Sequence, residues 1–175
     1  MAVLERIRSI FRPLPEPEIV IPAPQMSYGI RPLTTKQLEE VVKLNRRCFL
    51  KDESYSRNTF SYLLKNSNTL AYQVVTPTEL IIGFIVVTVG EDRVAHITTI
   101  GVAPEHRKRG IAKKLLIFTE KSLLKRGIGT IRLEVRVSNI AAQELYQNLD
   151  YFITQRFESY YNNNEDGFIM VKSLY

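Results

Sequence analysis

The chain has 175 residues, of which 45% are hydrophobic and 24% charged, and its formal net charge is +6. This length and composition predict one globular domain with a core, and the single cysteine, Cys48, excludes an internal disulfide framework. The longest apolar stretch, residues 80–89, is too short to span a bilayer, and charged residues interrupt any signal-peptide core, so we expect a cytoplasmic protein without a membrane span.

The first part of the chain, residues 1–26, is predicted to be an extension outside a folded domain of residues 27–175. Four apolar residues near its start have the spacing of a short amphipathic helix: Leu4, Ile7, Ile10 and Phe11. Several prolines then impose an extended linker: Pro13, Pro15, Pro17, Pro22 and Pro24. The sequence leaves open whether this extension is a flexible tail or carries a docking helix.

The next part of the chain is predicted to contain short helices and then strands. Residues 28–31 read as a strand, and Thr34 with Gln37 makes a capping box at the start of an amphipathic helix. A second helix is expected over residues 56–65. Three strands follow in succession, separated by turns: 69–75, 80–89 and 94–102.

The last part of the chain begins with a longer helix, predicted from about Gly110 to Arg126, with Gly127 as its C-terminal cap. Its buried side is expected to hold five apolar residues: Ile111, Leu115, Leu116, Phe118 and Leu123. A strand over 130–137 and a helix capped by Ser138 or Asn139 follow, and a hairpin of strands 151–160 and 167–173 ends the chain. This order predicts a mixed α/β fold around one sheet.

A basic loop leads directly into the helix that begins near Gly110. From His106 to Lys114 the chain reads HRKRGIAKK, with five formal positive charges in nine residues. The first amides of a helix lack internal partners and lie at its positive end, and a glycine lets the backbone approach a ligand closely. Together with the charges of Arg107, Lys108 and Arg109, these features predict a pyrophosphate site. A purely structural basic turn is the alternative.

This segment resembles the signature of the GCN5-related N-acetyltransferases (GNAT). Arg107-x-x-Gly110-x-Ala112 matches Q/R-x-x-G-x-G/A, which in that family binds the pyrophosphate of acetyl-coenzyme A. The resemblance runs from about Tyr28 to Leu174. It implies a GNAT fold, with a twisted, mostly antiparallel sheet, two splayed strands and flanking helices. It also implies acetyl-coenzyme A as cosubstrate, no metal, and cofactor contacts from a set of residues: Ile100, Gly101, Val102, Arg107, Lys108, Arg109, Gly110, Ile111, Ala112, Lys113 and Asn139.

A second region carries a longer match. Residues 133–151 resemble the LEVR-x-SN-x-xA-x-x-LY-x-x-L-G/D-F/Y run of the RimI-type and Ard1-type protein N-terminal acetyltransferases. Residues 160–170 resemble the YY…EDA…M ending of the same enzymes, with Gly167 in place of alanine. The family resemblance therefore points to a particular class of acetyltransferase.

Glu134 is the candidate general base. The alternation of strand residues places Glu134 on one face with Arg132 and Arg136, opposite the apolar residues Ile131, Leu133, Val135 and Val137. A carboxylate there can accept a proton from an amine, directly or through a water, although it could equally pair with its flanking arginines. The resemblance favours the base. It also implies that Tyr146 donates a proton to the departing thiolate, whereas the residue pattern alone favours a core tyrosine.

The acceptor is expected to be a protein or peptide N-terminus. A free α-amine has a pKa of about 7.7–8.0, against about 10.4 for lysine, so deprotonation at pH 7 costs roughly 1 kcal/mol for the former and roughly 4.6 kcal/mol for the latter. A modest base such as Glu134 suits the first. In the family two loops flank the entering N-terminus, which makes four aromatic residues candidates to bind the substrate: Phe49, Tyr55, Tyr160 and Tyr161. A ribosomal protein is one candidate substrate, and the chain is expected to be a monomer or a homodimer.

Other interpretations remain open at this point. The same fold could acetylate lysine or a small-molecule amine, or could sense acetyl-coenzyme A without catalysis. A basic module that binds nucleic acid is a different class, but a single compact cluster of charge suits a phosphate group better than a duplex, so we expect no nucleic-acid partner. His96 lies in a predicted strand and is interpreted as a packing residue.

Overall fold

The computed structural model describes residues 20–49 and 54–175. The predicted amphipathic segment at the N-terminus lies outside these residues. So do residues 50–53, which belong to the loop between Phe49 and Tyr55 that is predicted to flank the substrate. The described strands form one seven-stranded sheet in the order β1-β2-β3-β4-β5-β7-β6. They are β1 (Gly29–Pro32), β2 (Thr69–Val75), β3 (Ile81–Val89), β4 (Val94–Val102), β5 (Thr130–Arg136), β6 (Phe152–Phe157) and β7 (Gly167–Ser173).

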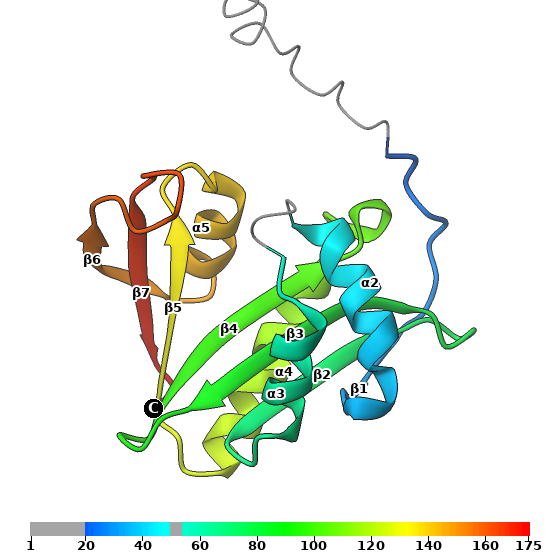
Figure 1. Ribbon diagram of the computed structural model, residues 1–175, viewed down its shortest axis with the longest axis horizontal. Helices are drawn as coiled ribbons and strands as arrows, with labels where there is room; N and C mark the ends of the chain where they lie inside the picture. The colour runs from blue at the N-terminus through cyan, green and yellow to red at the C-terminus, as the bar shows by residue number, and fades with distance from the viewer. Residues whose placement is uncertain (1–19, 50–53) are drawn as a thin grey trace, which may run out of the picture.

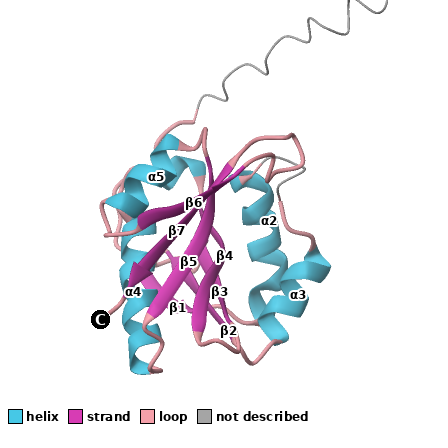
Figure 2. Ribbon diagram, turned by 90° about the vertical axis from the view of Figure 1, so that its left-hand side faces the viewer, coloured by secondary structure: helices cyan, strands magenta, loops and turns pink. Residues whose placement is uncertain are grey.

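Helices cover both faces of this sheet. They are α2 (Leu38–Cys48), α3 (Arg57–Lys65), α4 (Ile111–Lys125) and α5 (Ile140–Gln147), with single 3-10 turns at η1 (Thr35–Gln37) and η2 (Pro104–His106). Figures 1 and 2 show α2 and α3 on one face of the sheet, over β2 to β4, and α4 and α5 on the other. The predicted mixed α/β architecture and element order are confirmed.

Local signals place the helix ends where the sequence predicts them. The capping box of Thr34 and Gln37 forms, although it caps the 3-10 turn that precedes α2 rather than α2 itself. The side chain of Ser56 caps α3, and that of Asn139 caps α5 by accepting a hydrogen bond from the Ala142 amide at 3.2 Å. Gly127 follows α4 with a φ of +70°, as a C-terminal glycine cap requires.

The buried side of α4 differs from the prediction at one residue. Ile111, Leu115, Leu116 and Leu123 are buried as predicted, but Phe118 is 39% exposed. It lies at the margin of the helix and packs edge-on against Tyr72 of β2, with ring centroids 5.0 Å apart. Thr119 and Glu120 are buried instead, because each polar group has an internal hydrogen-bond partner.

The sheet divides between β4 and β5, the two central strands. All neighbouring strands are antiparallel except these, which pair in parallel over only three residue pairs, from Val94–Thr130 to His96–Arg132. The pairing of β4 with β3 contains a bulge at this point, in which Thr98 of β4 is the extra residue. Such a bulge bends the strand that carries it. Beyond it the strands diverge, as Figure 1 shows, and the predicted splay is confirmed. We call this opening the fork.

Candidate active site

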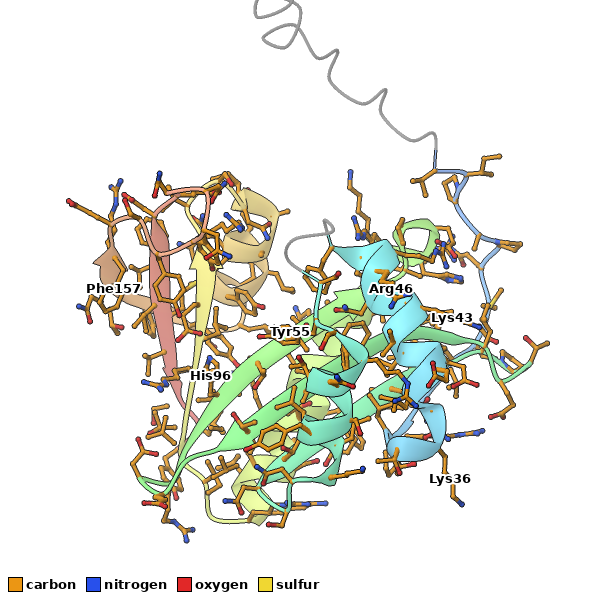
Figure 3. All side chains as sticks on the ribbon, in the orientation of Figure 1. Lys36, Lys43, Arg46, Tyr55, His96 and Phe157 are labelled. Atoms are coloured by element: carbon orange, nitrogen blue, oxygen red, sulfur yellow. The ribbon has the colours of Figure 1, made fainter. Side chains whose placement is uncertain are left out.

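Glu134 and His96 meet at the base of the fork. The alternation along β5 buries Ile131, Leu133 and Val135 and turns Glu134 to the other face, where its side chain is 19% exposed. Across the fork, His96 Nε2 lies 2.5 Å from Glu134 Oε2. Figure 3 shows the labelled His96 on β4, at the point where the two strands part. The interpretation of His96 as a packing residue is therefore incomplete, because its ring is a direct partner of the candidate base.

The environment of Glu134 keeps its carboxyl group ionised. Burial acts to raise its pKa, but the hydrogen bond and charge of His96, together with the charge of Arg132, outweigh burial and lower the pKa below its ordinary value. The group is thus a carboxylate at neutral pH, held at hydrogen-bonding distance from an imidazole. Such a pair can accept a proton from a neighbouring amine.

Three of the four predicted substrate residues surround this pair. The Tyr55 hydroxyl donates to the Thr98 carbonyl at 3.2 Å, which places the tyrosine in front of β4 (Figure 3). The rings of Tyr160 and Tyr161 pack edge-to-face, with centroids 5.1 Å apart. In all three, burial raises the pKa of the phenol, and the nearby Glu134 charge raises it further. The fourth, Phe49, directly follows α2 and is half-buried against the core.

The loop that carries Tyr160 and Tyr161 is fixed by its own contacts. Glu165 accepts from the Ser138 amide at 3.0 Å and forms an ion pair with Arg136 at 2.8 Å. The Arg136 guanidinium also lies 3.9 Å from the centroid of the Tyr161 ring. A Cβ at Gly167 would come within 3.2 Å of both tyrosine rings, so the glycine that replaces the family's alanine lets both rings approach β7 closely.

Tyr146 projects from α5 and is 6% exposed. Its ring contacts that of Tyr151 at a centroid distance of 5.5 Å. Within residues 20–49 and 54–175, its hydroxyl group has no hydrogen-bond partner. Burial, and after it the proximity of Tyr161, raises the pKa of the phenol, so Tyr146 carries its proton at neutral pH.

The loop before α4 has the backbone geometry that the sequence predicts. Gly110 adopts a left-handed conformation with a φ of +73°, which favours glycine. In the described part of the chain, no side chain caps the start of α4. The amides of Ile111, Ala112 and Lys113 are therefore available to an anion at the positive end of the helix dipole.

The arginines of this loop are engaged by the protein's own backbone. Arg107 donates to the carbonyls of Val102 at 3.1 Å and Cys48 at 3.2 Å. Arg109 donates to the carbonyls of Ala23 and Pro24, the latter at 2.8 Å. These contacts position the loop, so the amides of α4 and the exposed lysines Lys108 and Lys113 are the groups left for a ligand.

Part of the predicted N-terminal extension lies against this loop. Besides its contacts with Arg109, Ala23 donates its own amide to the Glu105 carbonyl at 3.0 Å. The Tyr28 hydroxyl donates to the Arg109 carbonyl at 3.4 Å. Local sequence patterns could not reveal these contacts, because they join residues more than eighty positions apart.

The free edge of β4 runs from the base of the fork towards the α4 loop. Ile100, Gly101 and Val102 pair with β3 on one side, and beyond His96 no described strand pairs with β4 on the other. A Cβ at Gly101 would meet the Phe84 ring at 2.7 Å and the Cys48 sulfur at 3.1 Å, so glycine is required there. An extended ligand can hydrogen-bond to such an edge as an additional strand would.

Two further site types have no candidate in the described residues. Residues 20–49 and 54–175 contain no cluster of three or more His, Cys, Asp or Glu side chains able to hold a metal ion. No helix in these same ranges has the length and apolar character needed to cross a membrane.

Known proteins are similar to this chain in sequence and in fold. Residues 38–151 match the acetyltransferase (GNAT) family. An N-alpha-acetyltransferase of Saccharolobus solfataricus is 28% identical over 84% of this chain and 93% of its own length. The N-terminal acetyltransferase B catalytic subunit NAA20 of Arabidopsis thaliana is 38% identical over 49% of each chain. The crystal structure of the ribosomal-protein-S18-alanine N-acetyltransferase of Escherichia coli superposes with a TM-score of 0.78 at 27% identity, covering 85% of this chain and 94% of the other.

Proposed function

The chain belongs to the acetyltransferase (GNAT) family, and from this premise we propose that it acetylates the α-amine of a protein N-terminus. The observation that carries the proposal is the Glu134–His96 pair at the base of the fork, with Tyr55, Tyr160 and Tyr161 around it. A proton acceptor bordered by aromatic rings suits a short, extended peptide whose terminal amine points at the carboxylate.

Acetyl-coenzyme A supplies the activated acetyl group. The chain offers two features that fit it: the amides at the start of α4 fit its diphosphate, and the free edge of β4 at Ile100–Val102 fits its amide-containing arm. Arg107 and Arg109 act in this proposal by holding the loop in place, whereas Lys108 and Lys113 supply exposed positive charge. Asn139, whose side chain caps α5, is proposed to contact the cofactor as well.

The reaction needs two proton transfers, and we assign one candidate group to each. Glu134, hydrogen-bonded to His96, accepts a proton as the amine nitrogen bonds to the acetyl carbonyl carbon. Tyr146 donates its phenol proton to the sulfur when the carbon–sulfur bond breaks. At neutral pH the phenol is protonated, as this role requires, and its hydroxyl has no competing hydrogen bond from residues 20–49 and 54–175.

An α-amine is a better match than a lysine for this base. Glu134 has a lowered pKa and is therefore a weak base, which suits an amine with a pKa of about 7.7–8.0 better than one near 10.4. The two similar acetyltransferases whose names specify a protein N-terminus point in the same direction. Phe49 and the three tyrosines are proposed to pack the first residues of the peptide.

The proposal is tested with peptides that separate the two kinds of amine. One peptide has a free N-terminus and no lysine, and its partner has a blocked N-terminus and an internal lysine. We expect acetylation of the first, at a rate at least about a hundredfold above that of the second, detected by mass spectrometry with acetyl-coenzyme A as donor. Equal rates, or transfer to lysine alone, would refute the α-amine assignment.

Several finer expectations remain proposals. A ribosomal protein belongs in the substrate panel because the Escherichia coli relative is named for one. The division of the chain at residues 26–27, a monomeric or homodimeric state and a cytoplasmic location remain predictions from the sequence.

A further inference from the structure

Arg132 lies beside the candidate base, Glu134. It precedes Glu134 by two residues on β5, so both side chains project from the same face of the strand. Of the two arginines that flank Glu134, Arg136 is ion-paired with Glu165, whereas Arg132 is exposed. In the ranges 20–49 and 54–175, Arg132 has no salt bridge and no side-chain hydrogen bond.

The surroundings of Arg132 belong to the acceptor site. Its register partner on β4 is His96, and its partner on β7 is Val171, which pairs in turn with Phe152 of β6. The Arg132 charge adds to the effect of His96 in lowering the pKa of the Glu134 carboxyl, and it opposes the larger effects of burial and of Glu134 that raise the pKa of the Tyr160 phenol. It therefore acts on the two groups that border the acceptor amine. Among the helices that the structure describes, none covers this face over β5, β7 and β6, as Figures 1 and 2 show.

We propose that Arg132 gives the enzyme a preference for N-termini with an aspartate or glutamate at the second or third position. The proposal rests on the proposed function, in which the α-amine lies at Glu134. An extended chain advances about 3.3 Å per residue, and Glu134 and Arg132 are separated by two such steps along β5. A substrate side chain one or two residues from the amine therefore lies within reach of the long arginine side chain.

Charge complementarity explains why the partner is acidic. The Arg132 guanidinium attracts a carboxylate and repels an ammonium group, and a substrate side chain that lies closer to Arg132 than to Glu134 feels this attraction more strongly than the repulsion of the catalytic carboxylate. Because Arg132 is exposed, the gain is modest, roughly twofold to fivefold in kcat/KM, as for other solvent-exposed ion pairs. It also decreases at high ionic strength, because salt screens exposed charges.

The test compares three peptides that differ only at positions two and three, carrying glutamate, glutamine or lysine there. The wild-type enzyme should prefer glutamate over glutamine by roughly twofold to fivefold at low ionic strength, and less at high ionic strength. Arg132→Gln should abolish this preference while the glutamine peptide is still acetylated. Arg132→Lys should keep the preference, and Arg132→Glu should transfer it to the lysine peptide.

A matched control separates local from general charge effects. Arg126 is an exposed arginine at the C-terminal end of α4, and Arg126→Gln makes the same charge change away from the fork. It should leave the peptide ranking unchanged. If the wild-type enzyme ranks the three peptides equally, or Arg132→Gln keeps the glutamate preference, the role of Arg132 is refuted. Failure to acetylate any of the three N-termini would instead refute the proposed function.

Discussion

The chemistry of Glu134 depends most strongly on one neighbour, His96. Buried as it is, its carboxyl group would have a raised pKa, and the His96 hydrogen bond is the largest of the interactions that reverse this. The imidazole therefore does more than occupy space in the sheet. It keeps the candidate base ionised in the half-buried environment where an amine can lose its proton.

Substitution of either residue should slow acetyl transfer without weakening cofactor binding. We expect Glu134→Gln to lower kcat by about a hundredfold or more, the usual contribution of a general base. We expect His96→Gln to move the acid limb of the pH–rate profile to higher pH, because burial then raises the Glu134 pKa with less to oppose it. Steady-state kinetics across pH and a coenzyme A binding assay provide the measurements. An acid limb that stays in place would show that His96 does not tune Glu134.

At this scale the sequence predicts Glu134 but not its partner. Glu134 is the only carboxylate of its strand. The residues alone leave it as either a base or an ion-pair partner, and the match of its segment to a family motif favours the base. The role of His96 depends on the parallel register of two strands that are 38 residues apart at this contact, and no local pattern encodes that register. The same limit applies to Arg109, whose backbone partners lie in residues that resemble a linker.

The connection between β6 and β7 shows how an element can be fixed without packing into the core. Two carboxylates hold it: Glu165, through Ser138 and Arg136, and Asp166, through Ser159 and Arg156. Hydrogen bonds from Ser138, followed by those from Arg136 and Asn163, lower the pKa of Glu165 to about 2. Ion pairs and hydrogen bonds therefore support the loop that carries the candidate substrate residues Tyr160 and Tyr161.

This support should weaken in acid. A carboxyl group with a depressed pKa in the folded chain contributes stability that is complete above its unfolded pKa, near 4.5, and is lost as the pH falls towards about 2. Glu165→Gln should therefore be less stable than the wild type at neutral pH, and the two should converge through this window. Denaturant unfolding at several pH values measures the difference. A gap that is constant with pH would contradict the assignment.

The sequence predicts the bounds of helices and strands more accurately than it predicts which of their residues are buried. Turn residues and helix caps such as Ser56, Asn139 and Gly127 act locally, so the predicted bounds of helices and strands agree closely with the structure. The predicted burial of Phe118 on α4 is wrong, because the residue is 39% exposed and its ring packs edge-on against Tyr72. Glu120 was not expected inside, because its partners come from distant strands.

For the whole molecule, Glu120 joins elements from both halves of the sheet. It accepts a hydrogen bond from Tyr151 at 2.9 Å and forms an ion pair with Lys172 of β7 at 2.6 Å. The side chains of the ion pair are 10% and 16% exposed, respectively. Through them α4, which packs against β2 to β4, is tied to the C-terminal half of the sheet.

Loss of this charge should destabilise the entire fold. Glu120→Gln leaves Lys172 largely buried without a counter-charge, and we expect a loss of about 3 kcal/mol in the free energy of unfolding. Glu39→Gln is the matched control, because the ion pair of Glu39 with Arg57 is 59% and 57% exposed and should contribute less than about 1 kcal/mol. Equilibrium unfolding in urea compares the two variants. Similar losses for both would contradict a structural role for Glu120.

The fork has a mechanical consequence. Since β4 and β5 share only three residue pairs, the two halves of the sheet are joined at a short seam, and Glu120 ties them on the face that α4 covers. Acetyl-coenzyme A that lies along the free edge of β4 would lie between β4 and β5 where they are not paired, and would thus bridge the two halves of the sheet. The cosubstrate would then complete the sheet as well as supply the acetyl group, and departure of the product would leave the two halves joined by the three residue pairs and Glu120 alone.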